Sequence, residues 1–270
     1  MCIRDREDVA EKNVQYLNSG NRKPIYDYLI QGLGGVPLME SPGIIDWEGE
    51  KVLPDYSVIE DVVTVFSQSK NMEDYFVKNP GEIKDFAKFI RNPLAQEQFM
   101  DFLISDYNDD IQSSKKPNIK KFDQDELFYI RHHDGNLGYV DKGRTGDELI
   151  AEFGTNISEA KKSLKETEFS IYKLAYFKAI GEINDNMSLK NKIAHIEANP
   201  STYKNQYLAA NPISTAIGKY QIMWSLHKDK IKSYLPEGDI SSVPVTSSTN
   251  SSTVSGSSRD SIPDPMGVIK

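Results

Sequence analysis

The chain has almost no cysteine: its 270 residues include a single one, Cys2. One thiol cannot form a disulfide within a chain, so the sequence excludes a small disulfide-stapled scaffold. Residues 1–6, which contain this cysteine, resemble a translated sequencing adapter, and we leave them out of the fold prediction. We therefore expect no disulfide and no thiol chemistry in the remaining sequence.

The sequence also lacks long apolar runs and an excess of basic residues. Its apolar runs are far shorter than the roughly 20 residues that a membrane-spanning helix needs, so we predict no membrane insertion. The start of the chain has no apolar signal-peptide core, and we expect no signal peptide. With a net charge of −8 and a pI of about 5.2, the chain shows no basic face, and we predict no binding to nucleic acid.

Strand signals are scarce as well, since no segment alternates apolar and polar residues between hairpin turns. Apolar residues recur at helical spacing instead, and at 38% hydrophobic the chain can bury one or two cores. We therefore predict a mainly α protein. The segments with a helical pattern are Glu7–Ser19, Pro24–Gln31, Val58–Phe66, Ile83–Ile90, Leu94–Ile104, Ser158–Asn184 and Leu189–Glu197.

Composition divides the rest of the chain into three regions. We assign residues 7–154 to an N-terminal helical region and residues 155–237 to a second helical domain. In the second domain, the apolar stripe that includes Phe169 and Tyr172 is typical of a core face, and we expect it to pack behind the helix that ends at Glu197. Residues 238–270 are rich in Ser and Thr, which predicts a disordered tail or flexible linker.

Two short motifs resemble metal sites, and their spacing argues against both. The segment that starts at Asp106 begins like a calcium-binding loop, but its sixth position is Ile111 instead of Gly, and its twelfth is Pro117 instead of an acid. His132 and His133 are adjacent, and no third ligand follows at zinc spacing. We predict no metal site and no cofactor.

The stretch Lys190–Trp224 carries the strongest functional signal. Leu189, Ile193 and Glu197 are four residues apart, so one side of a helix carries both aliphatic side chains and a carboxyl group. Pro200 ends that helix soon after the acid. Burial raises the pKa of a carboxyl group because desolvation penalises the charged form. A glutamic acid that stays protonated near neutral pH can donate a proton to a glycosidic oxygen.

The loop after this helix contains Tyr, Asn, Gln and Ser with few charges, a composition that suits neutral sugars. Gly218 has no Cβ, so the backbone can turn sharply there or let a substrate approach. Tyr220 and Gln221 would then direct a hydroxyl and an amide toward Glu197. The alternative is that Glu197 is a solvated residue at a helix end and that the two Asn-Pro pairs only interrupt the chain.

These residues resemble a known family. Glu197, followed by Asn211-Pro212, Ser214, Ala216, Gly218 and Tyr220-Gln221, resembles the core of the lysozyme-like superfamily, especially lytic transglycosylases and the muralytic domains of phage virion proteins. The similarity covers about residues 190–224 and departs from the family where Ala198-Asn199 replaces Ser-Gly. It implies a lysozyme-like helical domain with Glu197 as general acid. In the transglycosylase branch, the same Glu would also act as base, and the reaction would need no second catalytic carboxylate and no metal. The substrate-binding residues that it implies are Asn211, Ser214, Gly218, Tyr220 and Gln221.

The same resemblance bears on the domain division. Phe89–Gln96 is similar to a segment that often follows the core in phage lysozyme-like domains, which makes residues 7–154 a candidate for the tail of a first such domain. An accidental match is the alternative. Residues 155–237 lack the helices that normally follow such a core, so the second domain is incomplete unless earlier helices substitute for them.

The function that the resemblance implies is cleavage of peptidoglycan glycan strands, by a muramidase or lytic transglycosylase within a phage virion-associated protein. The expected partners are peptidoglycan strands and other virion proteins, and the expected location is the virion, or the bacterial cytoplasm before release. One alternative is a non-catalytic phage structural or scaffold protein with a degenerate lysozyme-like core. Another is a helical interaction module without affinity for glycans.

Overall fold

The computed structural model describes Ile25 and residues 56–238 of the chain. The segments predicted as helices at Glu7–Ser19 and Pro24–Gln31, apart from the buried helical residue Ile25, lie outside this range, as does the predicted tail from residue 239 onward. The α-helices are α3 Tyr56–Gln68, α4 Lys70–Lys78, α5 Ile83–Ile90, α6 Pro93–Ser113, α7 Gln124–Asp134, α8 Gly146–Phe153, α9 Ile157–Ser163, α10 Glu166–Ala179, α11 Leu189–Glu197 and α12 Trp224–Ile231.

The remaining elements are short. Single turns of 3₁₀-helix are η2 Pro80–Glu82, η3 Ile119–Lys121, η4 Gly138–Asp141, η5 Gln206–Leu208 and η6 Lys232–Tyr234. Strands β1 Ala216–Ile217 and β2 Ile222–Met223 form an antiparallel pair, in which Ala216 is opposite Met223. Within residues 56–238 this pair is the only sheet, so the prediction of a mainly α protein is confirmed. None of the helices described is long and apolar enough to cross a membrane.

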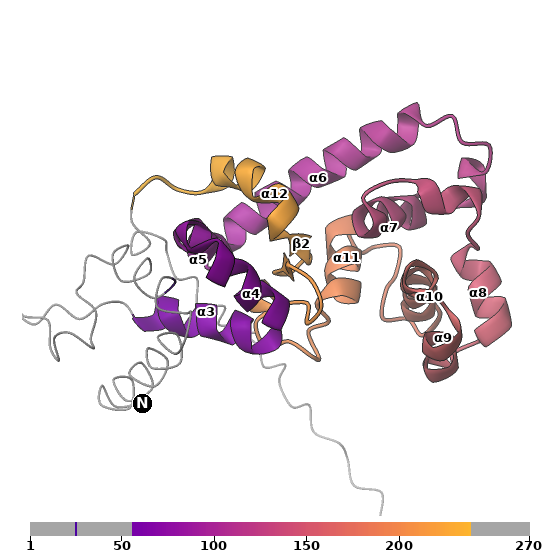
Figure 1. Cartoon of the computed structure of the whole chain (residues 1–270). Helices are drawn as coiled ribbons and strands as arrows, with labels where there is room; N and C mark the ends of the chain where they lie inside the picture. Colours follow the sequence, from indigo (N-terminus) through magenta and orange to yellow (C-terminus); the bar gives the residue numbers. More distant parts are fainter. Residues whose placement is uncertain (1–24, 26–55, 239–270) are drawn as a thin grey trace, which may run out of the picture.

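The long helix α6 links two groups of helices (Figure 1). Helices α3, α4, α5 and α12 lie on one side, and α7, α8, α9 and α10 lie on the other. Helix α11 and the two strands lie between these groups. The segment that carries the strongest sequence signal is therefore central in the fold.

Aromatic side chains form the core of the first group. Trp224 is fully buried, and its ring packs edge-on against Phe86 with a centroid separation of 5.3 Å. Phe76 and Phe89 each lie 6.1 Å from Trp224. The indole N–H donates a hydrogen bond to Glu82 at 3.2 Å, which satisfies the one polar group that this ring buries. Because Trp224 follows β2 directly, this core fixes one end of the central segment.

Several helices predicted from apolar spacing are present with similar bounds. The pattern at Val58–Phe66 corresponds to α3, and the pattern at Ile83–Ile90 to α5. The pattern at Leu94–Ile104 lies within α6, which continues to Ser113 and includes the first residues of the rejected calcium motif. Helix α11 ends at Glu197, as expected from Pro200.

The prediction of one long helix over Ser158–Asn184 is wrong. The chain forms α9 and α10 there, because Leu164 and Lys165 adopt extended backbone angles between them. Helix α10 ends at Ala179, and Gly181 follows with a φ of +77°, a left-handed conformation that stops a helix. The apolar stripe therefore lies mainly on α10, where Phe177 packs edge-on against His195 of α11 at 4.8 Å.

Packing crosses the predicted boundary between residues 154 and 155. Helix α10 contacts α7 and α8, which precede the boundary, and α12 contacts α5. Buried apolar residues from both sides of residue 154 belong to one hydrophobic cluster. Helices that precede residue 155 therefore supply packing surfaces for the segment that follows it.

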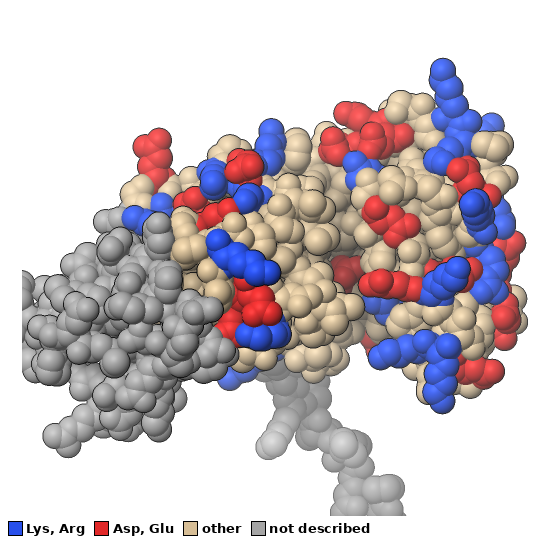
Figure 2. Space-filling view, in the orientation of Figure 1, with Lys and Arg blue, Asp and Glu red and all other residues tan. Residues whose placement is uncertain are grey.

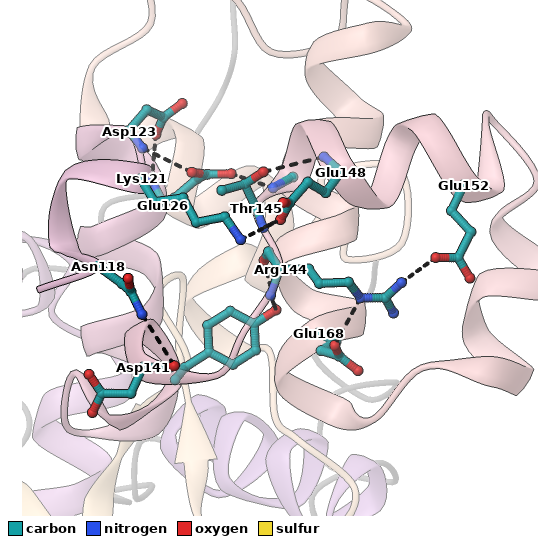
Figure 3. A network of polar contacts seen from close by, with 12 residues as sticks. Asn118, Lys121, Asp123, Glu126, Asp141, Arg144, Thr145, Glu148, Glu152 and Glu168 are labelled. Atoms are coloured by element: carbon teal, nitrogen blue, oxygen red, sulfur yellow. Dashed lines mark hydrogen bonds and ion pairs between the residues drawn. The ribbon is translucent and has the colours of Figure 1, made fainter.

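Polar contacts hold α7, α8 and α10 together (Figure 3). Asp123 and Thr145 form capping boxes at the first turns of α7 and α8. The carboxylate of Glu126 accepts hydrogen bonds from the backbone N–H groups of Asp123 at 2.9 Å and Gly146 at 2.5 Å. Gly146 lies so close to α10 that an added Cβ would be 2.7 Å from the Cβ of Ala175. These contacts join the first turns of α7 and α8 and pack the start of α8 against α10.

Candidate active site

A pocket of about 430 Å³ lies where the ends of three helices meet the loop around β1 and β2. The last residues of α7 and α11 and the first residues of α10 contribute to it. Figure 2 shows a hollow on this face between the two groups of helices, with acidic atoms on its floor. We call it the acid pocket; its lining residues are His132, His133, Asp134, Glu166, Thr167, Glu197, Asn211, Ile213, Ser214, Ala216, Gln221 and Met223.

Glu197 is the last residue of α11, and its carboxylate is half-buried in this pocket. The hydroxyl of Tyr129 on α7 donates a hydrogen bond to its Oε1. Burial raises the pKa of Tyr129 well above the usual value, and the nearby charge of Glu197 raises it further, so Tyr129 remains a hydrogen-bond donor. None of the residues at 56–238 donates a hydrogen bond to Oε2, which leaves that oxygen available to a substrate.

His132 and His133 differ although they are adjacent. The Nε2 of His132 lies 2.8 Å from the carbonyl oxygen of Tyr220, which requires a proton on Nε2, and its Nδ1 lies 3.3 Å from the hydroxyl of Tyr107. Burial lowers the pKa of His132, so its ring is neutral at pH 7. For His133, the hydrogen bond to Asp134 raises the pKa, and the charge of Glu197 acts in the same direction.

Asp134 is a second carboxylate in the pocket. Its Oδ1 lies 3.0 Å from Nδ1 of His133 and accepts a hydrogen bond of 2.9 Å from the hydroxyl of Thr167. Because Thr167 is in the first turn of α10, this bond joins the end of α7 to the start of α10. Glu166, the neighbour of Thr167, adds a third, exposed carboxylate to the pocket.

Helices α3 and α4 hold the loop that supplies Asn211 and Ser214. Gln68 donates a hydrogen bond to the carbonyl of Leu208 at 3.1 Å and accepts one from the N–H of Ala210 at 3.0 Å. The hydroxyl of Ser69 donates to the carbonyl of Ser214 at 3.1 Å. Two adjacent residues at the α3–α4 junction thus fix both ends of the loop that faces Glu197.

Gly218 and Gln221 form a tight turn between β1 and β2. Gly218 has a φ of +77°, and a Cβ there would lie 2.1 Å from Oε1 of Gln96, so both the backbone angle and the space require glycine. Gln221 also has a positive φ, of 49°. Its side chain lines the acid pocket, and its Nε2 donates to the carbonyls of Ala209 at 3.2 Å and Gly218 at 3.0 Å.

Tyr220 lies behind the pocket instead of in it. Its side chain is fully buried, and its hydroxyl donates a hydrogen bond of 2.6 Å to Glu97 of α6. Glu97 also accepts hydrogen bonds from Lys219 at 2.8 Å and Tyr207 at 3.1 Å, and it lies 3.1 Å from Lys190. Burial opposes ionisation of Glu97, but hydrogen bonds from Lys219, Tyr220 and Lys190 outweigh it and lower its pKa to about 2.

Of the six residues expected at the site, the structure therefore brings four into one pocket: Glu197, Asn211, Ser214 and Gln221. The other two, Gly218 and Tyr220, support the turn that carries Gln221 and do not line the pocket. No sequence pattern indicated a role for Tyr129, which is 68 residues away from its partner Glu197. No pattern indicated Asp134 or Thr167 either, and His132 and His133 were considered only as zinc ligands and rejected.

Within Ile25 and residues 56–238, no group of three or more His, Cys, Asp or Glu side chains is arranged to hold a metal ion. Comparison of the chain with protein-family models, with curated proteins and with solved structures gave no match. The arrangement of side chains in the acid pocket is therefore the basis for assigning a function.

Proposed function

We propose that this chain cleaves the glycan strands of peptidoglycan, with Glu197 as the general acid. The main support is that Glu197, Asn211, Ser214 and Gln221, chosen from sequence, line a single pocket. The resemblance of residues 190–224 to the lysozyme-like core supports the same chemistry. It also supports a place in a phage particle, beside other virion proteins.

The proposed reaction uses the two oxygens of Glu197 differently. Oε1 accepts the hydrogen bond from Tyr129, and the protonated Oε2 donates its proton to the glycosidic oxygen as the bond to the anomeric carbon breaks. The resulting carboxylate then takes a proton from the incoming nucleophile. That nucleophile is water in a hydrolase, or the 6-hydroxyl of the same sugar in a lytic transglycosylase.

The walls of the pocket suit a neutral sugar. Asn211, Ser214 and Gln221 offer amide and hydroxyl groups, and the side chain of Ile213 at the same pocket is 70% exposed. An exposed aliphatic side chain beside neutral polar groups can contact the apolar face of a sugar ring. This combination favours a glycan over a charged small molecule in the part of the pocket beside Glu197.

A non-catalytic wall-binding role is the second candidate. Ala198 occupies the position where the family has a serine, and it is fully buried, so no hydroxyl follows the acid in the chain. The protein would then bind glycan strands as a structural part of the particle without cleaving them.

The test is digestion of purified peptidoglycan by the full chain and by Glu197→Gln. We expect the intact protein to clear the suspension and the variant to lose about 10²- to 10⁴-fold in rate, the usual contribution of a general acid. Glu237→Gln, at an exposed residue that makes no ion pair with any residue described, is the matched control and should retain full activity.

Mass spectrometry of the products distinguishes reducing ends, formed by hydrolysis, from anhydro-sugars. Equal clearing by Glu197→Gln and by the intact protein would refute the assigned role of Glu197. Binding of the intact protein to insoluble peptidoglycan without release of soluble products would select the non-catalytic candidate.

A further inference from the structure

A second pocket adjoins the acid pocket. It has a volume of about 330 Å³ and lies between η4 and the first turn of α10. Thr167 lines both pockets, so they meet at that side chain. We call the second one the lysine pocket, after Lys142 and Lys165 in its lining.

One wall of the lysine pocket is held rigidly. The hydroxyl of Tyr139 donates a hydrogen bond to the carbonyl of Arg144 at 2.9 Å and accepts one from the N–H of the same residue at 3.2 Å. Its ring lies across Gly143, where an added Cβ would be 2.1 Å from the ring. A glycine at this position is what allows the aromatic ring to form the wall.

The two pockets differ in charge. The acid pocket contains the carboxylates of Asp134, Glu166 and Glu197. The lysine pocket contains one carboxylate, Glu168, which accepts a hydrogen bond of 3.2 Å from Arg144, and Figure 3 shows Arg144 between Glu152 and Glu168.

Lys142 and Lys165, the cations that line the lysine pocket, do not pair with a carboxylate among the described residues. Lys142 and Lys165 are exposed, and neither makes an ion pair with any residue of the described ranges. The lysine pocket is therefore positively charged next to a negatively charged one.

We propose that the lysine pocket binds a carboxylate on the peptide substituent of a glycan strand whose sugar lies in the acid pocket. This inference rests on the proposed function. A sugar backbone without charge can lie beside Glu197, whereas an anionic group there would meet three carboxylates. Because the pockets meet at Thr167, a substituent that leaves the sugar on that side reaches Lys142 and Lys165. The preferred substrate is then a peptide-bearing glycan instead of a bare one.

Binding measurements test this inference without any turnover. The Glu197→Gln protein is titrated with a soluble N-acetylmuramoyl peptide that has free carboxylates, and with the same compound after amidation of the carboxylates. We expect the free acid to bind about tenfold more tightly, because two exposed ion pairs each contribute a few-fold. Added salt should reduce the difference, since it screens exposed charges.

Two pairs of substitutions locate the effect. Lys142→Gln/Lys165→Gln should abolish the preference for the free acid. Lys161→Gln/Lys162→Gln, a matched loss of two exposed lysines on α9, should retain it. Equal binding of the acid and the amide, or a preference that survives in Lys142→Gln/Lys165→Gln, would overturn the inference. So would competition by inorganic phosphate at the concentration of the peptide, because the pocket would then bind any anion.

The test of the lysine pocket and the test of glycan cleavage can succeed or fail independently. A preference for the free acid that depends on Lys142 and Lys165, found in a protein that does not cleave strands, would support the lysine pocket and contradict cleavage. Cleavage that depends on Glu197 but proceeds equally on peptide-bearing and peptide-free strands would support the proposed function and contradict the lysine pocket.

Discussion

Glu97 on α6 and Glu197 on α11 lie on opposite sides of the turn at residues 218–221, which we call the central turn. The two glutamates differ in how many hydrogen-bond donors surround them. Glu97 accepts hydrogen bonds from Lys219, Tyr207 and Tyr220, and its carboxylate also pairs with Lys190. Glu197 accepts one hydrogen bond within the described part of the chain, from Tyr129. The carboxylate of Glu97 is saturated with donors, while Oε2 of Glu197 accepts no hydrogen bond from the described residues.

The difference separates a structural role from a chemical one. A carboxylate with this many donors remains charged and ties the elements that carry them, whereas proton transfer needs an oxygen that is open to substrate. Residues 218–221 link the two environments, because the side chain of Tyr220 points to Glu97 while that of Gln221 lines the acid pocket. We therefore expect substitutions on the Glu97 side to lower stability and those on the Glu197 side to lower activity.

The largest expected loss of stability comes from Gly218→Ala. The substitution adds the strain of a left-handed backbone at a φ of +77° and places a Cβ against Gln96. We expect the free energy of unfolding to fall by about 3 kcal/mol, measured by urea denaturation. Activity should fall as well, because Gln221 is carried by the same turn.

Gly181→Ala is the control, since Gly181 has the same φ of +77° and no atom within 4 Å of an added Cβ. It should cost only about 1 kcal/mol, which is the backbone strain alone. If the two variants lose the same free energy, contact with Gln96 is not what requires glycine at residue 218.

Glu97→Gln removes the charge on the saturated side. Since hydrogen bonds to charged groups contribute more than neutral ones, we expect the free energy of unfolding at pH 7 to fall by about 2 kcal/mol. Asp101→Asn, which removes the more exposed partner of Lys190, should cost less than 1 kcal/mol. If Asp101→Asn lowered the free energy of unfolding more than Glu97→Gln, the structural role assigned to Glu97 would be contradicted.

The contribution of Glu97 to the free energy of unfolding should decrease as the pH is lowered. Its pKa is about 2 in the folded protein against an ordinary value of 4.5, so between these values the unfolded state binds more protons. The stabilisation by Glu97 is therefore complete above pH 4.5 and is lost as the pH falls toward 2. Urea denaturation from pH 7 to pH 3 should show the intact protein and Glu97→Gln converging in free energy of unfolding.

The same comparison shows how far the sequence could predict this molecule. Helical spacing predicted α3, α5 and α11, because burial on one face imposes a period that any helix of a core must follow. Pro200 predicted the end of α11 at about Ala198, next to its last helical residue Glu197, since a proline cannot continue a helix. Local rules of this kind need no knowledge of distant contacts.

The partners of the central turn could not be predicted in this way. The direction of Tyr220 depends on Glu97, which is 123 residues away, and on the positive φ of Gln221, which no helical or strand period describes. The hydroxyl that binds Glu197 comes from Tyr129 of α7, a helix that is not among the segments predicted from apolar spacing. Tertiary packing, and not local spacing, placed these donors.

The smallest expected effect is that of Tyr129→Phe, which tests the surroundings of Glu197. Tyr129→Phe removes its one donor within residues 56–238. We expect a drop of about tenfold in kcat with little change in KM, because the donor orients the acid and does not bind substrate.

Tyr172→Phe distinguishes this effect from a general loss of packing. Tyr172 is also a fully buried tyrosine, and its hydroxyl donates to the carbonyl of Gly154 at 3.0 Å, outside the acid pocket. Both variants should lose about 1 kcal/mol of unfolding free energy. Only Tyr129→Phe should change kcat. An unchanged kcat in Tyr129→Phe would mean that Glu197 does not depend on this hydroxyl, and the contrast with Glu97 would then lie in the number of donors alone.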